Sequence, residues 1–413
     1  MKIFDLKLKE KTTNLLNLYN QRKYDEVTNV TQKLIKEYPL SVTLWNLLGA
    51  ASKNLGNIDD SIRSFKKVIE LNPKYADGYN NLGVALQEKG NLDESIKHFN
   101  KALSLSPNYA QAYNNVGITY KKKGKLSLAA KYIKKAIFFN PNYVEAYNNL
   151  ATITQDQGKL NQAIEYFNKA ISLNPSYSEA YYNLGLVFSK LNEFDSAIKS
   201  YNKALSLKPN YPEAYNGLAT NISQKGKLDE AIKLFNRAIL LRPNYSEAYF
   251  NIGIVFKKQN KLYEALDSYQ KAINLKPNYV ESFYNAATVF QEQGKLNKAI
   301  DYYDKALLIS PDYDKAQAQK LYLKAQICDW KTTQEDKELF SKLGTYKKPI
   351  PPFTMLFFED EPRNHYLRSK LYAKKQYLQK QNPFKKIDKT SNKKRLRIGY
   401  FSSDLQNHAT MYL

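Results

Sequence analysis

Nine prolines recur along this chain at intervals of 34 residues without a single slip. Most of them stand in a phrase that has Asn, Ser or Lys before the proline and tyrosine two residues after it, as in Asn140-Pro141-Asn142-Tyr143. Proline ends one helix and fixes the backbone for the turn into the next. A fixed period of this length predicts a stack of repeated units rather than a single globular core. The nine are Pro39, Pro73, Pro107, Pro141, Pro175, Pro209, Pro243, Pro277 and Pro311.

A second set of residues falls midway between the prolines. Each member is glycine or asparagine, the residues that best tolerate the left-handed conformation in which helices end. Each unit is therefore predicted to consist of two short antiparallel helices. The set is Gly56, Gly90, Gly124, Gly158, Asn192, Gly226, Asn260 and Gly294.

The apolar residues within each unit identify the kind of helical repeat. An aromatic residue such as Tyr79 or Tyr181 stands early in the first helix, and small residues alternate with a large one such as Phe99 in the second. Small residues let two helices approach closely while large ones fill the space between them. This pattern resembles the tetratricopeptide repeat. It predicts an all-α, right-handed superhelical solenoid with eight full repeats over residues 42–313, a degenerate repeat or N-terminal cap over 1–41, and a C-terminal capping helix over 314–330.

One position of the first helix is asparagine in most repeats and is predicted to lie on the concave face. An amide offers both donors and acceptors, so a ladder of amides suits the backbone of an extended peptide from a client protein in the groove. The alternative is that these asparagines satisfy local or inter-repeat hydrogen bonds. The predicted peptide-binding residues are Asn81, Asn115, Asn149, Asn183, Asn251 and Asn285, and Leu47 and Gly217 interrupt the series.

Two further features, a recurring tyrosine and an isolated histidine, are interpreted as structural. The tyrosines of the proline phrases, from Tyr75 to Tyr313, are interpreted as packing between successive repeats, because a large residue at every turn suits that role. His98 stands alone among lysines and is interpreted as a solvated helix residue. We assign no metal-ligating or cofactor-binding residue to the array.

The composition limits location and partners. Cys328 is the only cysteine, and the N-terminal segment has no apolar stretch long enough for a signal peptide or membrane anchor, so a cytoplasmic location without membrane contact is expected. The net charge of +24 accompanies an excess of Asn, Tyr and Ile that indicates a codon bias, so we do not expect a nucleic-acid partner. Client proteins are the expected partners, and the repeats could also form a homo-oligomer.

The 34-residue register ends near Pro311, and a different composition follows. Residues 331–394 are predicted to form a helical junction segment with a helix from about 363 to 380. Residues 395–413 begin with Arg395-Leu396-Arg397-Ile398-Gly399-Tyr400-Phe401, which predicts one isolated strand and a Ser/Asp loop that open an incomplete α/β domain.

The repeats together with this tail resemble the protein O-linked N-acetylglucosamine transferases and their SPINDLY-like relatives. The motifs that carry the resemblance are Cys328-Asp329-Trp330, Ile350-Pro351-Pro352-Phe353 and the stretch from Arg395 through Asn407-His408. The resemblance implies that the array presents clients to a GT-B glycosyltransferase, which moves a sugar from UDP-N-acetylglucosamine to Ser or Thr without an essential metal. It assigns His408 to the catalytic cleft, although Gln406 and Ala409 depart from the family's Gly-Asn-His-Pro.

Leu413 follows Asp404 by nine residues, whereas a nucleotide-binding lobe needs roughly 100 residues. We therefore expect no donor site in this chain and no sugar transfer by it alone. Three readings stay open: the client-presenting part of an N-acetylglucosamine transferase, a SPINDLY-like O-fucosyltransferase fragment that would use GDP-fucose, or a stand-alone adaptor with no enzymatic role. A nucleic-acid role through the basic residues 363–397 is a weaker fourth.

Overall fold

The computed structural model describes residues 2–329, 342–345, 348–355 and 361–377 of the chain. These residues divide between two compact units, Met1–Pro277 and Asn278–Leu413. The described residues form helices joined by short turns, with no strand among them, and the predicted all-α solenoid of helix pairs is confirmed. The strand predicted within 395–413 lies outside the described residues.

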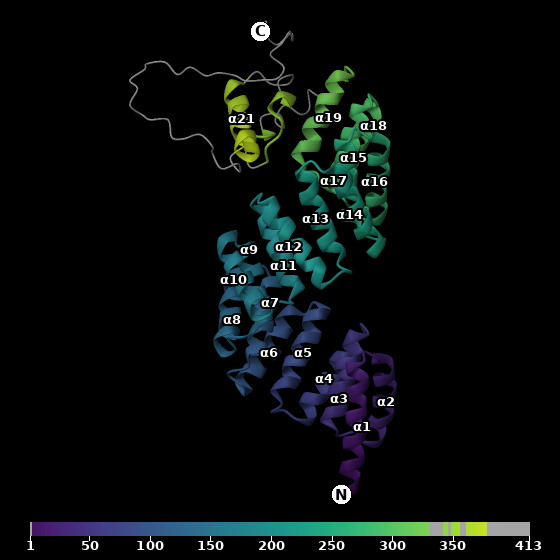
Figure 1. Ribbon diagram of the computed structural model, residues 1–413, viewed down its shortest axis with the longest axis vertical. Helices are drawn as coiled ribbons and strands as arrows, with labels where there is room; N and C mark the ends of the chain where they lie inside the picture. The colour runs from purple at the N-terminus through teal and green to yellow at the C-terminus, as the bar shows by residue number, and fades with distance from the viewer. Residues whose placement is uncertain (1, 330–341, 346–347, 356–360, 378–413) are drawn as a thin grey trace, which may run out of the picture. The chain divides into compact units, whose positions relative to one another are not determined.

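The first unit is a succession of helix pairs that follow one another in chain order, with α1 and α2 at one end (Figure 1). Its helices are α1 (Lys2–Asn20), α2 (Tyr24–Glu37), α3 (Val42–Asn54), α4 (Ile58–Leu71), α5 (Ala76–Lys89), α6 (Leu92–Leu105), α7 (Ala110–Lys122), α8 (Leu126–Phe139), α9 (Val144–Asp156), α10 (Leu160–Leu173), α11 (Ser178–Lys190), α12 (Phe194–Leu207), α13 (Pro212–Gln224), α14 (Leu228–Leu241), α15 (Ser246–Lys258) and α16 (Leu262–Leu275).

Among its described residues, the second unit contains one further helix pair, a single helix that follows it, and a segment outside the repeat register. Its elements are α17 (Val280–Glu292), α18 (Leu296–Ile309), α19 (Asp314–Gln326), the 3-10 helix η1 (Pro352–Met355) and α21 (Pro362–Tyr377). The helix expected from about 363 to 380 is α21.

The residues midway between the prolines end the first helix of each pair, as predicted. Gly90 has φ +92°, and the two asparagines in the series, Asn192 and Asn260, both have φ +60°. The amide of Asn91 donates to the carbonyl of Leu86 across this turn, which satisfies one of the carbonyls that a helix end leaves open. The turn is thus fixed by residue type at one position in each pair from α3–α4 to α17–α18, whereas Arg22 adopts the left-handed conformation, with φ +61°, between α1 and α2.

Each pair from α3–α4 to α17–α18 is held together by one large buried side chain from its second helix, whereas Thr31 stands at the equivalent position of α2. Phe99 in α6 is fully buried, and its ring lies so close to Gly83 of α5 that a Cβ on that glycine would stand 2.6 Å from it. The equivalent side chains in the other pairs are likewise buried: Phe65, Ile133, Phe167, Tyr201, Phe235, Tyr269 and Tyr303. The glycine and the ring together set the close approach of the two helices.

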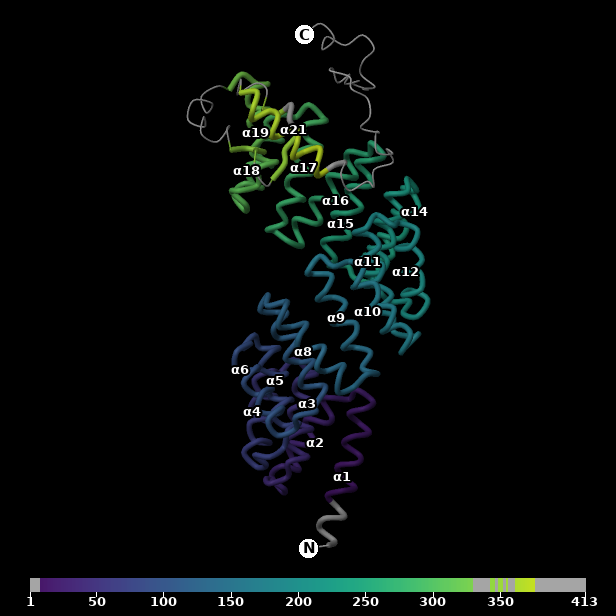
Figure 2. Tube along the Cα trace, turned by 90° about the vertical axis from the view of Figure 1, so that its left-hand side faces the viewer, coloured from purple at the N-terminus to yellow at the C-terminus, as the bar shows by residue number. Residues whose placement is uncertain are grey.

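The first helices of neighbouring pairs form the inner layer of the first unit. Helix α5 contacts both α3 and α7, and this continues along the series to α15. The second helices instead contact their own partner and the first helix of the next pair, as α6 does with α5 and α7. Figure 2 traces the same succession from the side. Because the first helices approach one another, side chains between them lie on the concave side of the stack.

The segment after α19 packs through a small core of its own. Leu343, Ile350 and Met355 are buried against Ala318 and Leu321 of α19. Arg368 of α21 has no exposed surface, and its Nε donates to the carbonyl of Leu343 at 2.8 Å. A buried guanidinium therefore ties α21 to the loop that precedes η1.

Candidate functional site: the asparagine rungs of the inner layer

The predicted ladder asparagines occupy one equivalent position on first helices of the pairs. Asn81, Asn115, Asn149, Asn183 and Asn251 lie on α5, α7, α9, α11 and α15 of the first unit, and Asn285 lies on α17 of the second. All six are half-buried. The five in the first unit therefore lie on the inner layer, where the sequence placed them.

Each ladder asparagine of the first unit donates a hydrogen bond to an asparagine of the preceding repeat. Asn115 Nδ2 donates to Asn80 Oδ1 at 2.9 Å. We call each such bond a rung. The four other rungs have the same 3.0 Å length and join Asn81 to Asn46, Asn149 to Asn114, Asn183 to Asn148, and Asn251 to Asn216.

The rungs fix the orientation of the ladder amides. The acceptors Asn80, Asn114 and Asn148 are only 1%, 4% and 8% exposed, so each accepts its bond from a nearly buried position. A buried amide oxygen without a donor would destabilise the fold, which favours the rung geometry. The ladder asparagine uses one of its two N–H groups in the rung, and its own Oδ1 and second N–H are the groups that can serve a ligand.

The rung is absent where the acceptor position is not asparagine. Tyr182 stands at that position on α11, and the ladder residue of the next repeat is Gly217, where a Cβ would stand 2.7 Å from the ring of Tyr201. One turn later, Asn221 donates to Ser189 Oγ of α11 at 2.8 Å and so ties the same two helices. In the second unit, Asn285 Nδ2 donates to the carbonyl of Glu281 on its own helix.

Sequence reasoning found the ladder residues but missed their partners. The sequence suggests either a peptide-binding role or an inter-repeat bond for these asparagines. The bond is present at five ladder positions of the first unit. The peptide-binding role stays a prediction. The signal that could have identified the acceptors is the doublet Asn80-Asn81, which recurs as Asn114-Asn115 and Asn148-Asn149. In each doublet the first residue accepts a rung from the following repeat and the second donates one to the preceding repeat.

The tyrosines of the proline phrases pack between repeats, which confirms their interpretation. Within the first unit, Tyr211 and Tyr245 are each 9% exposed. Burial raises the pKa of Tyr177 to about 12, with smaller contributions from Glu179 and Glu145. These phenols stay neutral at physiological pH and behave as packing groups.

The interpretation of His98 was wrong. Its ring stacks on Tyr79 with centroids 6.1 Å apart, and the side chain is about one fifth exposed. Burial lowers the pKa of the imidazole, and Glu94 opposes that effect. The His98 side chain thus covers Tyr79, the aromatic residue of α5. The sequence pattern of its own repeat did not reveal this contact.

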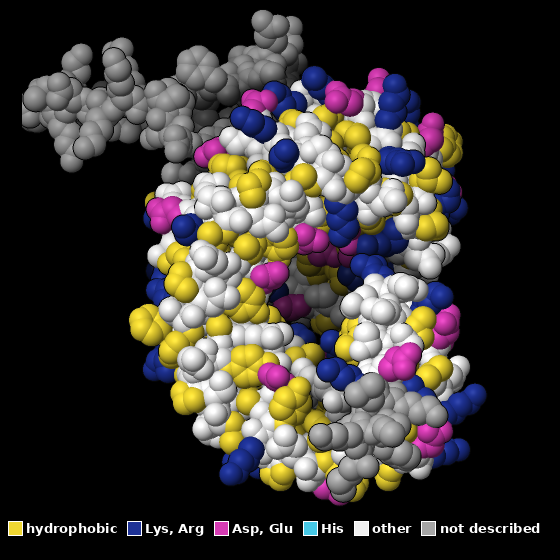
Figure 3. Space-filling model, turned by 60° about the horizontal axis from the view of Figure 1, so that its bottom comes forward, with side chains coloured by type: hydrophobic (Ala, Val, Ile, Leu, Met, Phe, Trp, Pro, Cys, Tyr) yellow, Lys and Arg dark blue, Asp and Glu magenta, His cyan; other side chains and the backbone are white. Residues whose placement is uncertain are grey.

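Charged side chains also link successive repeats on the surface. Lys89 Nζ lies 2.6 Å from Asp59 Oδ1, and this bond lowers the pKa of Asp59. Lys123 with Asp93 and Lys225 with Asp195 repeat the arrangement. On the face drawn in Figure 3, Lys and Arg side chains are interspersed with acidic and apolar ones and do not gather into one basic patch. The excess positive charge is spread over the surface in that view.

The remaining sequence predictions concern metals, membranes and the tail. Within the part of the chain that the structure describes, no three His, Cys, Asp or Glu side chains are grouped to hold a metal, and no helix has the length and apolar character needed to cross a bilayer. His408 lies outside the described residues, so its assignment to a catalytic cleft stays a prediction.

Comparison with protein-family models agrees with the repeat geometry. Models described as tetratricopeptide repeat match residues 110–143, 178–211 and 280–313, and a model described as TPR repeat matches 49–90, 85–124, 153–192, 223–260 and 255–294. The chain is a tetratricopeptide repeat protein. Arrays of this kind are scaffolds for protein–protein interaction, and the matched segments together cover most of the helix pairs.

Solved structures resemble this tetratricopeptide repeat protein over different shares of its length. The crystal structure of the APC/C hetero-tetramer Cut9–Hcn1 is 22% identical over 72% of this chain, with a TM-score of 0.54. The match spans 59% of that chain. MamA is 33% identical over 39% of this chain and 95% of its own, with a TM-score of 0.36. YrrB, described as a TPR protein with an unusual peptide-binding site, is 28% identical over 46% of this chain and 98% of its own, with a TM-score of 0.37. The search of curated proteins gives no significant match.

Proposed function

We propose that the inner layer of the first unit binds an extended segment of a client protein, and that the ladder asparagines contact the main chain of that segment. The observation that carries the proposal is the row of rungs, which holds five ladder amides in one orientation, on the consecutive first helices α5 to α11 and, after the interruption at Gly217, on α15. Amides that are already fixed lose little conformational entropy when they bind.

The rungs determine how the proposal must be tested. Replacing a ladder asparagine with alanine removes both the rung and the ligand-binding amide, so loss of binding by itself would not separate the two. Asn183→Ala and Asn148→Ala remove the same rung from its two ends, but only the first removes the ladder amide. The pair is therefore a matched comparison.

Peptides selected from a random display library on the full chain supply the probe. We expect Asn183→Ala to weaken binding of the selected peptides several-fold more than Asn148→Ala does, as measured by fluorescence anisotropy. Equal losses in the two variants, or no loss in either, would contradict a direct role for the ladder amides.

We further propose that the bound client is presented for O-linked glycosylation of Ser or Thr with UDP-N-acetylglucosamine as the donor. The support is the resemblance of the stretch from Arg395 to His408 to the O-linked N-acetylglucosamine transferases. The resemblance extends to SPINDLY-like relatives, which use GDP-fucose, and a stand-alone adaptor is the alternative without enzymatic activity.

Two measurements test this second proposal. The DNA sequence after the codon for Leu413 should encode a glycosyltransferase lobe, whereas a stop codon followed by unrelated sequence favours the adaptor. If the protein that includes such a lobe transfers labelled N-acetylglucosamine to a selected peptide, His408→Ala should lower the rate at least tenfold, because a histidine in the cleft would position or deprotonate the acceptor hydroxyl. Transfer of fucose instead would assign the protein to the SPINDLY-like branch.

A further inference from the structure

The outer face of the first unit carries a groove between consecutive second helices, and one residue position decides whether that groove is filled. The position runs through the series Ser64, His98, Tyr132, Tyr166, Ser200, Leu234 and Ser268. Hollows of about 650, 780 and 490 Å³ occur at Ser64, Ser200 and Ser268. A serine is therefore present at this position in all three hollows.

The larger residues show what fills the groove in other repeats. His98 stacks on Tyr79 of the first helix beneath it, and Tyr132 lies over Tyr113 with ring centroids 6.2 Å apart. Tyr166 likewise packs with the apolar residues of α9 and α10. The same fold thus accepts a tyrosine ring at this position and uses it to cover the aromatic residue of the first helix.

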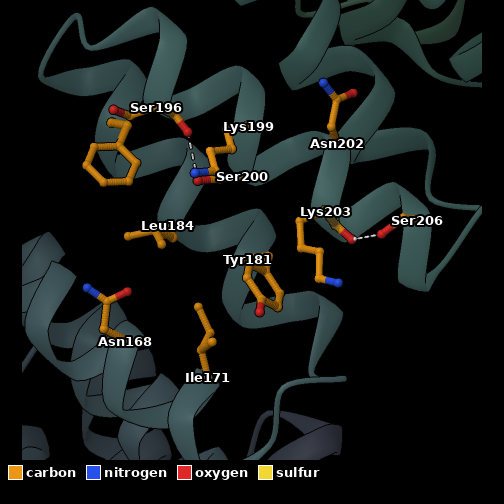
Figure 4. A pocket seen from close by; sticks show the side chains of 11 residues that line it. Asn168, Ile171, Tyr181, Leu184, Ser196, Lys199, Ser200, Asn202, Lys203 and Ser206 are labelled. Carbon is orange, nitrogen blue, oxygen red and sulfur yellow. Dashed lines mark hydrogen bonds between the residues drawn. The ribbon is translucent and has the colours of Figure 1, made fainter.

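The hollow at Ser200 is the largest of the three and lies between α10 and α12, over α11. Tyr181 and Leu184 of α11 form its floor, and Ile171 of α10 lies across from them (Figure 4). Ser200 hydrogen-bonds to the carbonyl of Ser196 on its own helix, so its side chain is held away from the floor that Tyr132 covers in its repeat. A volume of about 780 Å³ lies within the usual range for ligand sites, roughly 300–1,000 Å³.

Charge distinguishes this hollow from the other two. Lys199 and Lys203 are exposed at its rim, and none of the described residues that line it is acidic. The hollow at Ser64 contains Asp60, which pairs with Arg63, and the hollow at Ser268 contains Glu264 and Asp267. Only the hollow at Ser200 combines an aromatic floor with a purely basic rim.

We propose that the groove at Ser200 is a docking site for a partner-protein segment that inserts a tyrosine ring flanked by acidic residues. The ring takes the place that Tyr132 and Tyr166 occupy in their own repeats, and the acidic neighbours pair with Lys199 and Lys203. The site lies on the opposite side of the helix pairs from the rungs, so it serves a second partner rather than the client in the inner layer. The net charge of +24 disfavours a second copy of the chain as the occupant.

The internal series supplies the variant that tests the proposal. Ser200→Tyr places in this groove the residue that the fold already accepts at Tyr166, so the variant should fold and fill its own site. Tyr166→Ser is the matched control, because it alters the equivalent position of the neighbouring repeat and leaves the groove at Ser200 open. The probe is a fluorescent peptide with one tyrosine between glutamates, measured by anisotropy against the full chain.

We expect Ser200→Tyr to weaken binding of the probe at least tenfold, whereas Tyr166→Ser should leave binding unchanged or make it stronger. A probe with alanine in place of tyrosine should bind the wild-type chain at least tenfold more weakly. Lys199→Glu with Lys203→Glu should also weaken binding at least tenfold, and this surface variant tests the site independently of core packing. The proposal would be overturned if Ser200→Tyr bound the probe with wild-type affinity, or if the alanine probe bound as tightly as the tyrosine probe. It would also be overturned if the chain self-associated and Ser200→Tyr abolished that association.

Discussion

The pair α5–α6 and the described residues between 342 and 377, which include η1 and α21, are stabilised in different ways. In the pair, Phe99 packs against Gly83, only 16 residues away, and equivalent contacts recur in every neighbouring pair. In the segment, Ile350 and Met355 reach back to α19, and the buried Arg368 donates to a carbonyl 25 residues earlier. Local contacts repeated many times hold the first region, whereas an apolar cluster, the buried Arg368 and the bond from Lys348 to Asp312 hold the described part of the second.

The largest expected effect tests the packing of the pair. Phe99→Ala removes a fully buried ring and should lower the free energy of unfolding by about 3–5 kcal/mol. Because each pair supports its neighbours, the loss should appear in thermal unfolding monitored by circular dichroism as an earlier, less cooperative transition. Leu308→Ala, at a side chain that is 85% exposed, is the control and should change little. A loss below about 1 kcal/mol in Phe99→Ala would contradict the packing account.

The buried arginine of the second region should give the next largest effect. Arg368→Met keeps much of the side-chain volume but removes the bond to Leu343, and should destabilise the docking of α21 by about 2–3 kcal/mol. Hydrogen exchange should rise in α21 and in residues 342–345 while the exchange of α5 and α6 stays the same. Lys374→Met, on the exposed side of α21, should not alter exchange. Faster exchange throughout the repeats would mean that the two regions are not independently stabilised.

A rung between repeats is expected to contribute less than either core. The coupling energy between Asn148→Ala and Asn183→Ala should be about 0.5–1.5 kcal/mol in a double-mutant cycle from chemical unfolding. Asn114→Ala with Asn183→Ala, which share no rung, should show coupling near zero. Similar coupling in both cycles would indicate that the asparagines act through a general change of packing rather than through the rung.

The smallest effect concerns a surface tie in the second unit. Lys348 hydrogen-bonds to Asp312, and this bond lowers the pKa of the Asp312 carboxyl below its ordinary 3.8. Since the folded pKa is the lower one, the tie stabilises the fold fully above the ordinary value and is lost as the pH falls through the folded value. Carbon-detected NMR should therefore show Asp312 titrating below pH 3.8, and Lys348→Met should move its pKa upward. An unchanged pKa in the variant would show that the lysine does not hold the carboxylate.

The sequence predicted the repeats well because their determinants are local. Prolines and helix-ending glycines act within a few residues, and the large side chain of each pair acts within the same repeat, so their period alone predicts the helices and the pair geometry. The ladder asparagines followed from the same period. Their acceptors did not, because the Asn80–Asn115 rung joins residues 35 apart on different helices. The role of His98 and the burial of Arg368 likewise depend on neighbours that the period does not specify.

The contact pattern of the first unit has a consequence for changes in chain length. The main contacts of each second helix from α2 to α14 are with its own partner and with the first helix of the next pair. A deletion or duplication of 34 residues that starts and ends within equivalent turns would therefore rejoin matching surfaces and leave every remaining ring with its glycine or alanine. A change by one residue more or fewer would rotate the following helix by about 100° and expose its buried face. The stack can therefore vary in length only in whole repeats. Removal of the repeat that contains Ser200 would remove the proposed outer site, while the rungs of the earlier repeats would stay intact.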